Sequence, residues 1–231
     1  MIMTLHNRET AWAVARHIIP FILWVVIMSL PIKDVALRYA AQVVVCLVAF
    51  LALRPWRYYP AINIKALPLG VAVGVGVAGI WILPETIWIQ QFPALHEGYV
   101  RYFIRGSDSG SGYVYAPEQC GWALSLIKLA GSACVIAVIE EFFWRGFLMR
   151  WLVKQDFLAV EPRTVGRGLF WIAAIAFGFE HNRWLVGVVA GLAYGWLYCR
   201  KGDIAAVSVA HITTNYLLGL YVLATGSYSF W

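Results

Sequence analysis

Two adjacent glutamates, Glu140 and Glu141, lie with Arg145 in the run VIEEFFWRGF, which is otherwise apolar and aromatic. Ionisable side chains are costly in hydrocarbon, so carboxylates in such a run predict a functional site. Residues four apart share a helix face, so Glu141 is expected to pair with Arg145 in a supporting role. Glu140 points roughly a quarter-turn away and has the apolar, like-charged surroundings that favour a general base. A cluster that only ties helices together is the alternative, although such a tie needs no second, repelling glutamate.

Two histidines and an asparagine in later apolar segments are the candidate partners of Glu140. His181 ends the segment FGFEH, and His211 lies in AHITTN with Asn215 four residues further on the same helix face. Polar side chains on three separate membrane helices are expected to face inward and meet. Glu140 and His181 would then activate a water for attack on a peptide carbonyl. His211 and Asn215 would donate hydrogen bonds to the developing oxyanion.

Zinc is a rival use of the same atoms. Glu140, His181 and His211 would offer one carboxylate and two imidazoles, with a coordination position left open. The sequence leaves open whether the cofactor is zinc or none. Other intramembrane protease chemistries are excluded by the absence of an HExxH helix and of a GxSG nucleophile. The four aspartates flank the apolar segments and do not lie within them: Asp34, Asp108, Asp156 and Asp203.

The composition indicates that lipid faces most of this chain. Of its 231 residues, 61% are apolar and 13% charged, and the mean hydropathy is +0.71, whereas a soluble domain has about 25% charged residues. The predicted fold class is all-α, a polytopic transmembrane helical bundle of about seven to eight spans with a buried polar site. We interpret 1–231 as a single integral membrane domain and 121–220 as its catalytic core. The net charge of +6 comes from short basic loops, so no nucleic-acid partner is expected.

Apolar runs predict seven helices, since a membrane span needs about 20 residues. The fourth run is too long for one straight span, and a kink near Gly131 or a projection beyond the membrane would accommodate it. Before it, LHEGYVRYFIR is expected to form an interfacial helix and 106–112 a flexible connector. Basic residues after the second, fourth and sixth runs predict a cytoplasmic N-terminus. The runs are 11–30, 35–53, 67–83, 121–154, 168–181, 184–199 and 204–225.

The three motifs together resemble those of the CAAX-protease and bacteriocin-processing (CPBP, or Abi) family of intramembrane proteases. They are Glu140-Glu141-x-x-x-Arg145, Phe177-x-x-x-His181 and His211-x-x-x-Asn215, and they match the family in order and spacing over about 121–220. The resemblance implies an all-helical bundle whose general base is Glu140, with His181 as its partner. His211 and Asn215 match the second polar pair. Members of this family are described both as metalloproteases and as metal-independent glutamate proteases, so the resemblance does not decide the zinc question.

The resemblance further implies an intramembrane endopeptidase that cleaves a membrane-associated protein or peptide, in the cell membrane of a bacterium. The stretch EEFFWRGFLMRW is most similar to the bacterial branch found beside exosortase protein-sorting systems. Two other functions stay open. A non-catalytic partner, such as a peptide-immunity or sorting factor, would bind through the same polar pocket. A transporter would use the glutamates and histidines as a proton relay, but the sequence shows no inverted repeat.

Overall fold

The structure is a computed structural model, and it describes residues 2–105 and 111–231. The described residues are all-α, as predicted, apart from an isolated antiparallel bridge between Ile104 and Arg183. The helices are α1 (Ile2–Met28), α2 (Val35–Leu53), α3 (Leu67–Ile82), α4 (Ile87–Gln90), α5 (Pro93–Phe103), α6 (Pro117–Ala130), α7 (Ala137–Glu141), α8 (Met149–Trp151), α9 (Arg167–Glu180), α10 (Trp184–Lys201) and α11 (Ile204–Thr225).

Two flanking aspartates prove to be helix caps. Asp34 accepts a hydrogen bond from the backbone of Leu37 at the start of α2, and Asp203 accepts one from Ala205 at the start of α11. A carboxylate at this position satisfies backbone N–H groups that the first turn leaves without a partner. At its other end α11 stops at Gly226, whose φ of 71° is in the left-handed region that glycine adopts without strain. Both helices therefore begin and end where the sequence predicted.

Five helical stretches are long and apolar enough to cross a membrane, judged by length and composition. They are Arg8–Met28, Val35–Tyr58, Ile64–Gln90, Pro117–Trp151 and Ile204–Thr225. Helices α9 and α10 have 14 and 18 residues and are not among them. The structure thus supports a multi-pass membrane protein, and the span count of seven to eight stays a prediction.

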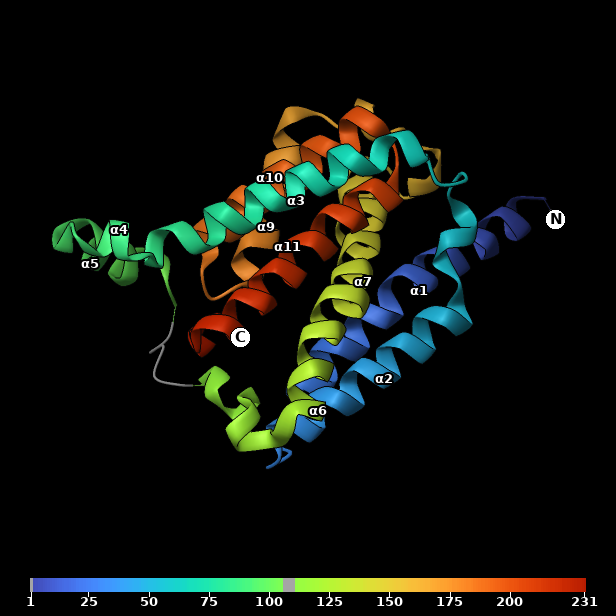
Figure 1. Ribbon diagram of the computed structural model, residues 1–231. Helices are drawn as coiled ribbons and strands as arrows, with labels where there is room; N and C mark the ends of the chain where they lie inside the picture. The colour runs from blue at the N-terminus through green and yellow to red at the C-terminus, as the bar shows by residue number, and fades with distance from the viewer. Residues whose placement is uncertain (1, 106–110) are drawn as a thin grey trace.

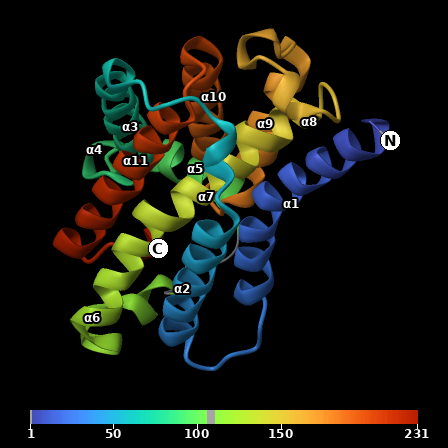
Figure 2. The same cartoon turned by 90° about the vertical axis from the view of Figure 1, so that its right-hand side faces the viewer.

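The helices are arranged around the long stretch formed by α6, α7 and α8. On one side α1 and α2 form an antiparallel pair, and on the other lie α3, α9, α10 and α11 (Figures 1 and 2). Glycines allow the closest of these contacts. A Cβ atom on Gly74 would collide with the carbonyl oxygen of Ala210, and one on Gly191 with the backbone of Ala174. Backbone can therefore approach backbone between α3 and α11 and between α9 and α10.

The long central stretch contains two π-helical segments, Gly131–Ile136 and Phe142–Leu148. A kink was one of the two features expected of this stretch, and the first π-helical segment begins at the expected position, Gly131. Non-helical backbone angles occur ten residues earlier, at Gly121. Segments of π-helix are rare and are frequent at functional sites. Here they flank α7 on both sides, and α7 ends with Glu140 and Glu141.

The polar stretch between α3 and α6 contains α4 and α5, which project from one end of the bundle (Figure 1). Helix α5 begins two residues before the interfacial helix that the sequence predicted. Most of the predicted connector, 106–110, lies outside the described residues.

Candidate active site

The four residues predicted to be catalytic line one cavity of about 190 Å³. Glu140 is at the end of α7, His181 directly follows α9, and His211 and Asn215 are one turn apart on α11. Glu140 and His211 are buried, at 7% and 3% exposure. The cavity has room for several water molecules, each of which occupies about 30 Å³ in the liquid. The predicted convergence of these side chains is therefore seen in the structure.

Glu141 is fully buried and is fixed by two partners that bind the same oxygen. Its Oε1 lies 2.9 Å from Nη1 of Arg145 and 2.9 Å from Nδ1 of His211. Arg145 also donates to the carbonyl oxygen of Gly191 and lies 4.1 Å above the ring of Phe177. The pairing of Glu141 with Arg145 was predicted from their spacing. The contact with His211 was missed, because no local pattern connects residues 70 positions apart.

His211 lies between the two glutamates. An ionised carboxylate only accepts hydrogen bonds, so the proton shared with Glu141 belongs to Nδ1 of His211. The other ring nitrogen, Nε2, lies 3.6 Å from Oε2 of Glu140. That distance is too long for a direct hydrogen bond, and it leaves the Glu140 carboxylate accessible to the cavity that it lines. The two glutamates are thus unequal, as expected.

His181 is oriented by the end of α9. Its Nδ1 lies 3.0 Å from the carbonyl oxygen of Phe177 and must donate to it, because a carbonyl oxygen only accepts. In a neutral ring Nε2 is then the acceptor nitrogen. Within the described parts of the chain, no hydrogen bond or ion pair joins His181 to Glu140, its predicted partner. The two side chains share the cavity wall, which is the arrangement that a bridging water requires.

Asn215 also reaches the cavity, but one of its amide hydrogens is already used. Its Nδ2 donates to the carbonyl oxygen of Ser132, at 3.1 Å. Ser132 belongs to the first π-helical segment and itself lines the cavity. The side-chain amide keeps a second hydrogen for a ligand.

Comparison with known proteins assigns the part of the chain that contains this geometry. Residues 122–217 match the model of a family described as Type II CAAX prenyl endopeptidase Rce1-like. This part of the chain is an Rce1-like domain. All seven residues of the three motifs fall within it: Glu140, Glu141, Arg145, Phe177, His181, His211 and Asn215. No curated protein and no solved structure matches the chain. The match does not identify an exosortase-associated branch, which stays a prediction.

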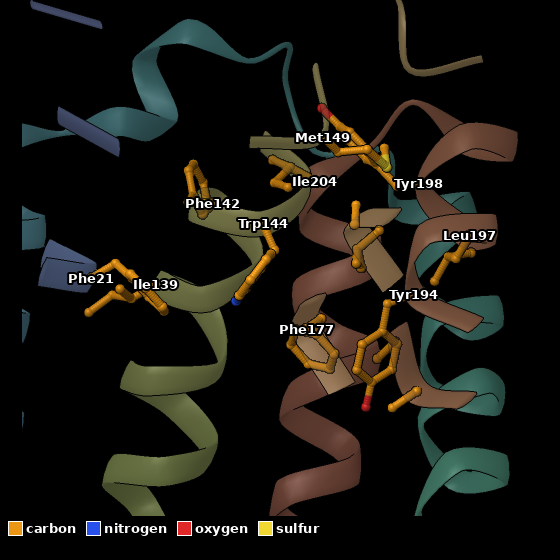
Figure 3. Packing of buried hydrophobic residues seen from close by; sticks show 14 of the residues in the cluster. Phe21, Ile139, Phe142, Trp144, Met149, Phe177, Tyr194, Leu197, Tyr198 and Ile204 are labelled. Carbon is orange, nitrogen blue, oxygen red and sulfur yellow. The ribbon is translucent and has the colours of Figure 1, made fainter. Parts of the chain in front are cut away.

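Aromatic side chains of the Rce1-like domain surround the residues predicted to be catalytic. The ring of Tyr194 stacks on His211 with centroids 4.9 Å apart, and its hydroxyl donates to Thr214 at 2.7 Å. Figure 3 shows Phe177, Tyr194 and Trp144 gathered between the helices at this level. Trp144 donates to Glu180 at 2.8 Å. No sequence signal pointed to Tyr194 or Thr214, because a tyrosine and a threonine in apolar helices match ordinary packing residues.

The zinc alternative requires three ligands that point at one position. Over residues 2–105 and 111–231, no group of three or more His, Cys, Asp or Glu side chains could hold a metal ion. The Nδ1 atoms of His181 and His211 bind a carbonyl and a carboxylate, which leaves Nε2 of each ring as the nitrogen available to a metal. The side chains of the Rce1-like domain, as arranged here, do not fit the zinc site that the sequence left open.

Proposed function

We propose that this protein is an intramembrane endopeptidase that hydrolyses a peptide bond of a membrane-associated protein or peptide. One observation carries the proposal. Glu140 lines a cavity inside a bundle of apolar helices, while the adjacent Glu141 is held through its Oε1 by Arg145 and His211. A buried carboxylate with access to a small cavity is costly in a membrane unless it has a function. Membership of the Rce1-like domain in a protease family supports hydrolysis.

In the proposed mechanism, Glu140 removes a proton from a water held between it and Nε2 of His181. The resulting hydroxide attacks the scissile carbonyl carbon and forms a tetrahedral intermediate. Glu140 then passes the proton to the leaving nitrogen, the carbon–nitrogen bond breaks, and an amine and a carboxylic acid are released. General acid–base catalysis of this kind contributes roughly a hundredfold to ten-thousandfold to the rate.

His211 and Asn215 stabilise the oxyanion in this proposal. Asn215 offers its second amide hydrogen. In its doubly protonated form, His211 would donate from Nε2 to the oxyanion while Nδ1 still donates to Glu141. Donors placed where negative charge develops are among the largest contributions to catalysis of acyl transfer. Glu141 and Arg145 keep His211 in position and do not touch the substrate.

The proposal includes seven membrane spans, with the N-terminus in the cytoplasm. Helices α9 and α10 supply two of them, although α9 has only 14 residues. A helix of that length covers about 21 Å, less than the hydrocarbon thickness of about 30 Å. Its packing against α10 through Gly178 and Gly191 keeps it inside the bundle, where the site-forming residues that follow it also lie.

The test is cleavage of a peptide library by purified protein in detergent, compared with Glu140→Gln, Glu140→Ala and His181→Ala. Each substitution is expected to lower kcat/KM by several orders of magnitude, because groups that act as one unit lose most of the activity together. Glu97→Gln, at an exposed position of α5, is the matched control. Equal cleavage by all forms would refute the assignment. A binding partner without catalysis would instead keep its cellular function in Glu140→Gln, since an amide preserves shape and hydrogen bonding.

A further inference from the structure

Lys128 lines the same cavity as the catalytic residues, and the mechanism above does not use it. It lies on α6, within a stretch that is apolar and long enough to span a membrane. A lysine in such a stretch is expensive and marks a site or a path for ions or substrates. It sits near the end of α6, whereas Glu140 is on α7, so the two charged groups are at different levels of the cavity.

The ammonium group of Lys128 contacts aromatic rings and no acid. Its Nζ lies 4.2 Å from the ring centroid of Tyr39 and 4.7 Å from that of Tyr115. Within the described residues, no carboxylate lies within ion-pair distance of it. Cation–π contacts of this kind stabilise a positive charge by about 1 kcal/mol or somewhat more, but they do not neutralise it. A positive charge therefore faces the cavity without a counter-ion.

The separation of Lys128 from Glu140 along the helical stretch determines how many residues of a bound peptide would lie between them. Twelve positions separate them on one helical stretch, which corresponds to roughly 18 Å at 1.5 Å per residue. This is the separation of the two helix positions, and the side chains of both residues line the cavity. An extended peptide rises about 3.3–3.6 Å per residue. A peptide whose scissile carbonyl lies at Glu140 would thus bring a group three to five residues away to the ammonium.

We propose that Lys128 is an anion subsite that binds a carboxylate of the peptide substrate about three to five residues from the scissile bond. The carboxylate is the shared chemistry, and it comes either from a free C-terminus or from an acidic side chain. This inference rests on the proposed function for its register. Tyr39 and Trp231 supply aromatic walls, and Trp231 packs edge-on against Tyr115. The ammonium is therefore the feature of this end of the cavity that attracts an anion.

The test uses peptides of one cleavable sequence that differ only in the anion. One has a free C-terminal acid, one a C-terminal amide, and two amidated peptides have Glu or Gln four residues from the scissile bond. They are compared on wild-type protein, Lys128→Met and Lys128→Arg. Lys154→Met, at an exposed lysine, is the control. The readouts are kcat and KM for cleavage, together with the affinity of each peptide for Glu140→Gln with and without Lys128→Met.

Wild-type protein is expected to favour one acidic peptide over its neutral counterpart by about tenfold to a hundredfold, the range of a charged hydrogen bond, with the difference in KM. Lys128→Met should reduce that ratio to about one, while Lys128→Arg and Lys154→Met keep it. The peptide pair that shows the preference identifies the source of the carboxylate. Equal KM values within both peptide pairs, acid against amide and Glu against Gln, in wild-type protein overturn the subsite, whether or not Lys128→Met folds. If no peptide is cleaved, the proposed function fails, and the affinities measured with Glu140→Gln still decide the subsite.

Discussion

Two buried polar clusters each include at least one charged residue of the long helical stretch Pro117–Trp151, and they differ in the partners of those charged groups. The catalytic cluster consists of Glu140, Glu141, Arg145 and His211. The arginine cluster consists of His17, Tyr59, Arg150 and Tyr198. Arg150 donates to the carbonyl oxygens of Leu158 and Val160, both at 2.9 Å, and lies 3.4 Å from the hydroxyl of Tyr198.

His17 completes the arginine cluster. Its Nδ1 lies 2.7 Å from the carbonyl oxygen of Ala13, and its Nε2 lies 2.9 Å from the hydroxyl of Tyr59. Both ring nitrogens are therefore occupied, and the hydrogen-bond partners in this cluster are neutral oxygens. Such a network orders the loop after α8 against α1 and α10. We interpret it as a structural network, because its hydrogen-bonding groups are paired with one another.

The catalytic cluster is incompletely paired by comparison. Within the part of the chain that the structure describes, Glu140 has only the 3.6 Å contact with His211, and it lines the cavity. The second oxygen of Glu141 is buried and has no hydrogen-bond partner within the described residues. Unpaired buried carboxylate oxygens are costly. A buried charge alone, such as that of Arg150, therefore does not indicate catalysis. A buried carboxylate that is accessible from a cavity, such as Glu140, does indicate it.

The largest effect is expected for Glu140→Gln. The amide has the same shape but cannot accept the proton of the attacking water, so kcat/KM should fall roughly a thousandfold. The melting temperature in detergent should stay within a few degrees of wild type, because Glu140 has no close partner to lose. Cleavage assays and thermal denaturation on the same samples check both halves. A large fall in melting temperature would show that Glu140 stabilises the fold, and its role would then be structural.

The next effect is expected for Glu141→Gln, which breaks the buried contacts of the catalytic cluster. Removing one partner of a buried ion pair costs about 3–5 kcal/mol, and His211 loses the group that fixes its Nδ1 proton. Both stability and kcat should therefore decrease. Denaturation in detergent and steady-state kinetics would measure the two. Glu161→Gln is the control, since Glu161 pairs with Arg163 at the exposed surface. Unchanged stability would show that Glu141 contributes nothing to the fold.

The fold was predictable where apolar runs and the residues that begin or end helices determine it. The bounds of α2 and α11 agree with the sequence because Asp34 and Asp203 cap them and Arg54 and Gly226 adopt left-handed conformations at their ends. The π-helical segments could not be predicted. Their apolar residues suit an α-helix equally well, and only tertiary packing selects the wider turn.

The site was predictable where motif residues lie one turn apart, as in Glu141 with Arg145. It was not predictable where partners come from distant helices. The contact of His211 with Glu141 and the stacking of Tyr194 on His211 depend on how α10 and α11 pack. Nor did the sequence separate Arg150 from Arg145, because the distinction depends on which oxygens each meets in space.

Arg150→Met tests whether the arginine cluster stabilises the fold without contributing to catalysis. Methionine fills a similar volume but leaves the carbonyl oxygens of Leu158 and Val160 without their donor. Each buried unpaired group costs about 1–3 kcal/mol, so unfolding should become easier by about 2–4 kcal/mol. The specific activity of the protein that remains folded should equal that of wild type. Denaturation curves and active-site titration would check this. Loss of specific activity at full stability would show that Arg150 contributes to catalysis, and the two clusters would then no longer differ in their role.

The smallest effect is expected for Tyr194→Phe, which lies at the boundary of the catalytic cluster. The ring that stacks on His211 is kept, and only the hydrogen bond to Thr214 is lost, a change of about 1 kcal/mol in stability. Thr214 retains the carbonyl oxygen of Gly74 as an acceptor at 2.9 Å, so its hydroxyl stays paired. If the ring alone positions His211, kcat should fall less than about threefold, whereas Tyr194→Leu should lower it further. Equal kcat values for the two variants would mean that stacking does not orient His211, and that Glu141 positions it alone.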